Sequence, residues 1–167
     1  MQDIQQILVP VDFHQHTDDL AAFASGIANK LGATITFVHV VGHFAEVAAD
    51  AGFYPASVTE VEKEMEENAK KKMAALIEQH KAASPGCGGT VIIGEVADII
   101  VRYAMDNKID MIVMATHGAQ GIEKIMLGSV ADRVLKRAAC PILLFNPYKG
   151  ERGYQITTPI GDNVQPI

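Results

Sequence analysis

The residues best suited to chemistry are a glycine and a serine that stand together before an apolar helical pattern. Gly128 and Ser129 precede residues 130–138, whose apolar spacing predicts a helix. Glycine lets a backbone approach a ligand closely, and the free amides and dipole of a helix N-terminus attract anions. Ser129 can cap that helix and offer its hydroxyl. An anion site and an ordinary turn with an N-cap both fit these residues, so both interpretations stay open.

Three further segments place polar or small residues at the ends of apolar runs. They are Pro10-Val11-Asp12, His39-Val40-Val41 and Ala115-Thr116-His117-Gly118. In a wound parallel sheet, ligands bind beyond the carboxyl ends of the strands, where the strand order reverses. These segments, together with Gly128-Ser129, therefore form the candidate site.

Two common nucleotide-binding loops are missing from the sequence. No G-x-x-x-x-G-K-[ST] stretch occurs, and the glycines of Gly86-Cys87-Gly88-Gly89 precede a predicted strand, whereas a G-x-G-x-x-G loop follows one. The sequence also shows no evident general base and no Lys or Arg clamp, which rapid phosphoryl transfer normally needs. These features argue against P-loop hydrolases, dinucleotide dehydrogenases and rapid phosphoryl transfer.

The histidines and cysteines form no recognisable metal or catalytic group. His14 and His16 lack a third ligand in sequence, which favours surface positions over a metal site. His117, beside the glycine loop, fits a phosphate contact and a loop-shaping role equally well. Cys87 and Cys140 have no metal-type spacing, so we expect free thiols in a reducing compartment and a cytoplasmic protein.

The composition indicates one globular domain. Of 167 residues, 49% are apolar and 20% are charged, and no apolar run is long enough to span a membrane. The net charge of −6 argues against a nucleic-acid partner, because an acidic surface repels a polyphosphate backbone. The basic triplet 70–72 lies in a Glu-rich helical segment and is expected to be a solvated face. One compact phosphate ligand stays compatible, because a helix N-terminus supplies a local positive field.

Strand and helix patterns alternate from residue 6 to residue 145. Continuous apolar runs predict five strands, at 6–12, 33–41, 90–93, 110–115 and 142–145. Periodic apolar faces predict four helices, at 17–31, 58–77, 96–104 and 130–138. Strands that are apolar throughout are covered on both faces. The predicted fold class is therefore α/β, with a doubly wound five-stranded parallel sheet.

Turn and cap residues set the expected boundaries of these elements. Gly32 closes the first helix, and Thr59 with Glu62 fits a capping box for the second. The segment 42–56 has no clear period and is interpreted as a loop or lid, and 84–89 as a cluster of turn residues. We expect one domain over residues 1–147, followed by a polar tail over 148–167.

Residues 4–146 resemble the universal stress protein family. The resemblance rests on Ile7-Leu8-Val9-Pro10-Val11-Asp12, on His39-Val40, on Gly94 and on the stretch Ala139–Leu144. Its most specific part is Ala115-Thr116-His117-Gly118, then nine residues, then Gly128-Ser129-Val130. ATP-binding members of the family carry G-x-x-G, nine residues and G-[ST] in this order.

The resemblance implies the family's fold, a nucleotide-binding α-hydrolase-like architecture, and a bound adenine nucleotide (ATP, ADP or AMP). Asp12 would lie near the phosphates or a bound Mg²⁺, with Pro10 and Val11 beside it in the site. Val40 would contact the adenine, with Met114 next to it. The remaining implied nucleotide-binding residues belong to the phosphate loop: Ala115, His117, Gly118, Gly128, Ser129 and Val130.

The sequence departs from the family pattern at three positions near the implied phosphates. Ala115 replaces the first motif glycine, and its methyl group can crowd the ribose or the phosphates. Ala119 follows the second glycine, where many members have Arg or Lys, which removes one positive charge. His14 stands where the family often has Ser. Because the family also contains members that bind no nucleotide, that class stays open.

Three functions are compatible with these observations. The leading hypothesis is an ATP-binding homodimer that acts as a stress-response or signalling module. The second is the same fold with an empty site, acting by protein–protein contact, and the third is a slow ATPase. The resemblance implies dimerisation through the strand Ile142–Phe145 at the edge of the sheet, where an apolar strand left open invites pairing with a second copy.

Overall fold

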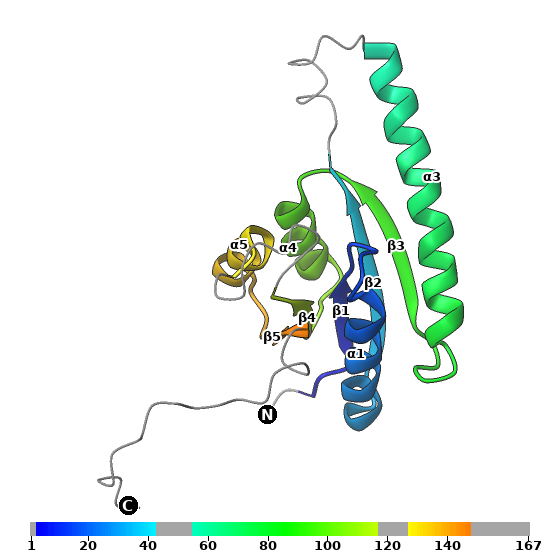
Figure 1. Cartoon of the computed structure of the whole chain (residues 1–167). Helices are drawn as coiled ribbons and strands as arrows, with labels where there is room; N and C mark the ends of the chain where they lie inside the picture. Colours follow the sequence, from blue (N-terminus) through cyan, green and yellow to red (C-terminus); the bar gives the residue numbers. More distant parts are fainter. Residues whose placement is uncertain (1–2, 43–54, 117–126, 148–167) are drawn as a thin grey trace, which may run out of the picture.

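Five parallel strands form the centre of the computed structural model, which describes residues 3–42, 55–116 and 127–147 (Figure 1). The strands are β1 (Gln6–Pro10), β2 (Thr34–Val41), β3 (Gly88–Ile93), β4 (Met111–Ala115) and β5 (Ile142–Phe145). They lie in the order β3-β2-β1-β4-β5, and every neighbouring pair is parallel. The predicted doubly wound five-stranded sheet is confirmed, with β5 at one edge.

Helices cover both faces of this sheet. Helices α1 (Thr17–Leu31) and α3 (Pro55–His80) pack on one face, and α4 (Val96–Asp106) and α5 (Ser129–Arg137) pack on the other. Figure 1 shows α3 on the opposite side of the strands from α4 and α5, with its N-terminal end extending past the sheet. Within the described residues, no helix is both long and apolar enough to cross a membrane.

The core consists of two apolar layers, one on each face of the strands. Ile7, Val9 and Phe37 point toward α1 and α3, and they are completely buried. Leu8 and Ile112, which are also completely buried, point toward α4 and α5. Successive side chains of a strand point to opposite faces, so a strand covered on both sides is apolar at every position. This is why the strands appear as unbroken apolar runs.

The ends of α1 follow local backbone chemistry. Asp18 and Asp19 occupy its first turn, where the helix dipole favours negative charge. Gly32 adopts the left-handed conformation (φ 69°) and donates its N–H to the carbonyl of Ala28, as predicted for the end of this helix. The chain then enters β2 beside β1, with Gln6 paired to Thr34.

Helix α3 starts earlier than its sequence pattern predicts. It begins at Pro55, so Thr59 and Glu62 lie inside the helix and the capping box predicted there is wrong as a helix start. A proline is well suited to a first helical turn, because its fixed φ matches the helix and its missing N–H has no partner there. Most of the predicted loop or lid, residues 43–54, and the predicted tail 148–167 lie outside the described residues.

The predicted cluster of turn residues at 84–89 is wrong at its end, because Gly88 and Gly89 belong to β3. A Cβ atom built on Gly89 would lie 2.4 Å from the sulfur of Met73 and 3.2 Å from Ile77. Glycine inside a strand allows this close approach of a neighbouring element. The absence of a side chain at Gly89 therefore lets α3 pack directly on β3.

Gly94 combines a backbone conformation that favours glycine with close packing against α4. Its φ is 158°, its N–H donates to the carbonyl of Val41 over 2.9 Å, and a Cβ atom would lie 2.8 Å from Cγ1 of Ile99. We expect Gly94→Ala to lower the free energy of unfolding by about 1–3 kcal/mol, from backbone strain and overpacking together.

Urea denaturation of the two variants Gly94→Ala and Gly88→Ala measures this effect. Gly88 is the matched control, because a Cβ atom there meets no other heavy atom within 4 Å. Equal stability changes in both variants would contradict the conformational role of Gly94.

Candidate functional site

The strand order reverses between β1 and β4. The chain leaves β1 toward α1 on one face of the sheet, and it leaves β4 toward α5 on the other face. In open α/β sheets, ligands bind at such a divergence, beyond the carboxyl ends of the two strands. The predicted segments 10–12 and 115–116 thus end adjacent strands, and 39–41 ends the next strand, β2.

The chain returns to the end of β4 just before α5 begins. The N–H of Thr116 donates to the carbonyl of Phe145, and the N–H of Gly128 donates to the carbonyl of Thr116, each over 2.8 Å. The amide of Gly128 is therefore already used within the chain. His117 and Gly118, two predicted site residues, lie outside the described residues, as does Ala119.

The N-terminus of α5 presents free polar groups at this edge. Gly128 is the N-cap, and Ser129 is the first helical residue, so the prediction that Ser129 caps the helix is wrong. The amides of Ser129 and Val130 lie in the first turn, where a helix offers them no acceptor. Among the described residues, the exposed Ser129 hydroxyl has no hydrogen-bond partner either. Two amides and one hydroxyl are thus available to an anion.

Asp12 stands at the other side of the reversal point, at the end of β1. Its Oδ1 accepts hydrogen bonds from the N–H of His14, over 3.1 Å, and from the hydroxyl of Thr17, over 3.4 Å. These bonds form a turn in which the side chain replaces a backbone acceptor. The carboxylate is exposed, and its Oδ2 accepts no hydrogen bond from the described residues.

Phe13, which follows Asp12 in this turn, has a strained backbone conformation. Its φ is 58°, in the left-handed region that bulky residues avoid, at a cost of about 1–3 kcal/mol. Its ring lies 4.5 Å from the ring of His39, and Nζ of Lys72 lies 5.9 Å from its centroid. The ring contacts offset the strain, and the backbone of Asp12 is fixed as a result.

His39 supports the same turn from β2. Its Nδ1 lies 2.8 Å from the carbonyl oxygen of Val11, and since a carbonyl only accepts, Nδ1 carries the proton. Burial lowers the pKa of His39, which the bond to Val11 and the charge of Asp12 oppose and the charge of Lys72 reinforces. A neutral imidazole is therefore the favoured form beside Asp12 at neutral pH.

The remaining predicted residues divide between the two faces of the sheet. Val40, Met114 and Val130 pack in the apolar layer under α4 and α5, and Met114 is buried (4% exposed). Ala115 packs in the layer on the α1 side, where its half-buried methyl group contacts core residues. Pro10 is half-buried, and Val11 is buried with its N–H bonded to the carbonyl of Val38.

Among the described residues at the ends of β1 and β4, Asp12 offers a carboxylate oxygen that accepts no hydrogen bond from them. Within the described residues, no three His, Cys, Asp or Glu side chains gather as a metal site. A single free carboxylate oxygen suits Mg²⁺, which proteins bind through one or two carboxylates together with phosphate oxygens and water.

Residues 3–146 match the model of the universal stress protein family. The chain belongs to this family. It is 33% identical over 147 residues to universal stress protein MJ0531 of Methanocaldococcus jannaschii, a match that covers 88% of this chain and 85% of that protein. It is 30% identical to universal stress protein A homolog 1 of Coxiella burnetii, over 83% of this chain and 94% of that protein.

Solved structures of the family share the fold of this chain. Universal stress protein UspA from Lactobacillus plantarum superimposes with a TM-score of 0.74 at 23% identity, over 87% of this chain and 99% of that one. A family member from Archaeoglobus fulgidus, solved in complex with dAMP, superimposes with a TM-score of 0.59 at 20% identity, over 86% and 98%. Another, solved in complex with cAMP, has a TM-score of 0.61 at 18% identity, over 87% and 99%.

The sequence pattern does not reveal the aromatic support of Asp12. Phe13 lies between β1 and α1, His39 in β2 and Lys72 in α3, and no spacing rule joins them. Lys72 belongs to the basic triplet predicted to be a solvated face, and it is exposed, but it also lies over the ring of Phe13. The sequence indicates only Asp12 and His39 as site residues, because Asp12 ends one apolar run and His39 lies near the end of another.

The pKa of His39 tests the electrostatics of this turn. We expect a pKa below the ordinary value of 6.5, a higher pKa in Lys72→Gln and a lower pKa in Asp12→Asn, because these charges act on it in opposite directions. Since the unfolded chain then binds more protons, the contribution of His39 to stability is full above pH 6.5 and is lost as the pH falls through the folded pKa.

An NMR titration of the imidazole resonances measures these shifts. Lys30→Gln is the matched control, since Lys30 ends α1 and is not among the groups that act on His39. Changes of the same sign in Lys72→Gln and Asp12→Asn would refute the arrangement.

Proposed function

We propose that this universal stress protein binds an adenine nucleotide (ATP, ADP or AMP) and acts as a cytoplasmic homodimer in stress response or signalling. The observation that carries the proposal is the placement of two complementary groups at one reversal point. The carboxylate of Asp12 ends β1, and the free first turn of α5 follows β4, its neighbour in the sheet. Family members solved with dAMP and cAMP support the choice of an adenine nucleotide.

In the proposed complex, one group of residues binds the phosphate and another contacts the base. The amides of Ser129 and Val130 and the Ser129 hydroxyl would hold a phosphate group, aided by the dipole of α5. Val40 would lie against the base, supported by Met114 in the same apolar layer. A bound Mg²⁺ would neutralise phosphate charge, and Asp12 is the residue that would hold it.

Nucleotide binding is tested by titration calorimetry. We expect heat on addition of ATP, and weaker binding of GTP, because an apolar contact leaves the extra polar groups of guanine unpaired. Gly128→Val should reduce ATP affinity at least tenfold while the protein stays folded, since a branched side chain would crowd the start of α5.

The matched control for Gly128→Val is Gly26→Val, on an exposed face of α1 where a Cβ atom meets no heavy atom within 4 Å. No heat with ATP, ADP or AMP at millimolar concentration would refute the proposal. That result would favour the second function, a stress protein that acts by protein–protein contact. Release of inorganic phosphate from bound ATP would instead favour the slow ATPase.

The dimer is proposed through the open edge of β5. The carbonyl of Pro141 accepts a hydrogen bond from Ile112 in β4, and that of Phe145 accepts one from Thr116, which directly follows β4. Because backbone groups alternate in direction along a strand, those of Ile142 and Leu144 face the open edge. The Leu144 side chain packs under α4 and α5, so a charge at this position would damage the core as well as the edge.

Leu144→Pro is therefore the sharper test of this interface. Proline removes the outward N–H and leaves the bonds between β4 and β5 in place. We expect a homodimer for the unaltered chain and a monomer for Leu144→Pro at micromolar concentration in light scattering. Leu144→Ala is the control, because it loses the same packing but keeps the N–H, and it should stay dimeric. A monomeric unaltered chain would contradict the proposed dimer.

A further inference from the structure

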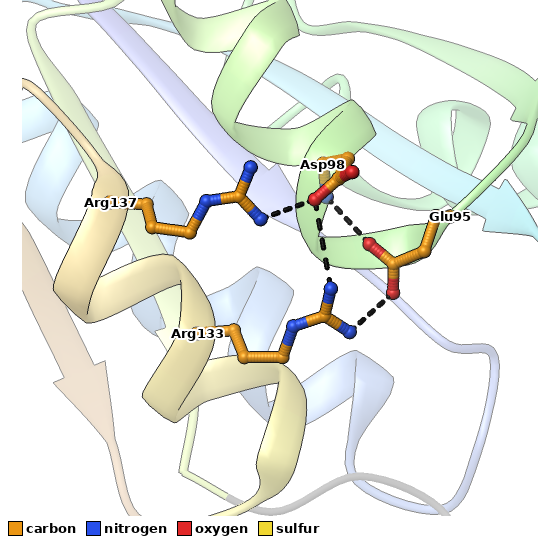
Figure 2. A network of polar contacts seen from close by, with 4 residues as sticks. All are labelled: Glu95, Asp98, Arg133 and Arg137. Carbon is orange, nitrogen blue, oxygen red and sulfur yellow. Dashed lines mark hydrogen bonds and ion pairs between the residues drawn. The ribbon is translucent and has the colours of Figure 1, made fainter.

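Helices α4 and α5 are joined by a network of four charged side chains (Figure 2). Arg133 lies 2.6 Å from Oε1 of Glu95 and 3.7 Å from Oδ1 of Asp98. Arg137 binds the same oxygen of Asp98, and Oε2 of Glu95 accepts the N–H of Asp98 over 2.9 Å as the N-cap of α4. Figure 2 shows both arginines pointing from α5 toward the first turn of α4.

The four members of this network do not depend on one another equally. If Arg133 left, Asp98 would keep its ion pair with Arg137, and Glu95 would keep the N–H of Asp98. If Arg137 left instead, Asp98 would retain only the longer contact to Arg133. Arg133 can therefore move out of the network while both carboxylates keep a hydrogen-bond or ion-pair partner.

The position of Arg133 on α5 places it beside the proposed phosphate site. Ser129 and Arg133 are four residues apart in one helix, so they lie on the same face with Cβ atoms about 6 Å apart. Helical side chains lean toward the N-terminus of their helix, so the Arg133 side chain leaves α5 on the side of Ser129, and its guanidinium reaches Glu95 and Asp98 at the start of α4. Glu95 follows β3, so it lies beyond the carboxyl ends of the strands, as Ser129 does.

We propose that Arg133 is a specificity-determining residue that selects nucleotides with a longer phosphate chain, and that Glu95 holds it back when no such chain is bound. This inference rests on the proposed nucleotide function. A monophosphate is held by the amides and hydroxyl of the first turn of α5. The further phosphates of ADP or ATP draw Arg133 away from Glu95 and pair with it.

The relative strengths of the two pairings favour this exchange. Arg133 and Glu95 are both nearly half exposed (46% and 44%), and exposed ion pairs contribute little to stability. A guanidinium pairs with a phosphate through two parallel hydrogen bonds to a group of higher charge. The exchange therefore costs little and gains a stronger contact, but only for a ligand long enough to reach Arg133.

The test compares AMP and ATP affinities, by calorimetry without added divalent cation, in the full chain and in Arg133→Gln and Glu95→Gln. Arg133→Gln should weaken ATP binding about tenfold and AMP binding less than twofold. Glu95→Gln should tighten ATP binding severalfold and leave AMP unchanged, because it releases Arg133 while its amide oxygen can still cap α4. Lys136→Gln is the control: Lys136 is also a cation of α5 paired with an acid, Asp132, but outside this network, and it should leave the ATP/AMP ratio unchanged.

The opposite signs distinguish the proposal from a structural role of the network. If the network only held α4 against α5, both substitutions would weaken both nucleotides and lower the melting temperature together, and that result would overturn the inference. An unchanged ATP/AMP ratio in Arg133→Gln would overturn it as well, with the nucleotide function intact. Absence of any nucleotide binding by the unaltered chain would overturn both proposals.

Discussion

The pairing of β1 with β4 is the contact on which the site depends, because it joins two strands far apart in the sequence and reverses the order of the sheet. Its register places Ile7 beside Met111 and Leu8 beside Ile112. Asp110 secures it: Oδ2 accepts the N–H groups of Gln5 and Gln6 over 2.9 Å each, and its own N–H donates to the carbonyl of Gln6. These donors lower the pKa of Asp110, so the bonds to its carboxylate persist in mild acid and weaken as the pH falls through that lowered value. A shift of this pairing by one residue would exchange the two faces of β1 and separate Asp12 from α5.

An acidic chain that binds an anion must create positive potential locally. The net charge of −6 works against any phosphate ligand at long range. Near the reversal point, the dipole of α5 and Lys72 above Phe13 act in the opposite direction, and Arg133 would add to them once it leaves Glu95. Local positive charge of this kind is sufficient for one small anionic ligand but not for a long polyanion. The net charge therefore argues against a nucleic-acid partner but not against a nucleotide.

The sequence predicted most of the architecture, because each strand and helix leaves a local apolar pattern. The five strands, their parallel arrangement and the glycine that ends α1 all follow from residues close together in the chain. Some errors are local, since α3 starts at Pro55 and Gly128 is the N-cap of α5. Others arose where a distant contact decides the local structure. Gly89 lies in β3 because α3 needs the space that a side chain there would fill, which no local rule anticipates. The aromatic support of Asp12 and the ion pairs of Arg133 were missed for the same reason, since each joins elements that only the fold brings together.

The two sides of the reversal point are fixed by interactions of different strength. On the β1 side, Asp12 is held by two hydrogen bonds, by the strained backbone of Phe13 and by the contact of that ring with His39. On the α5 side, the charged groups are exposed and are joined by ion pairs that a ligand can replace. A nucleotide would therefore meet a preformed carboxylate at one end and an adjustable cation at the other. That asymmetry would permit the proposed site to accept phosphate chains of different lengths while the position of Asp12 stays constant.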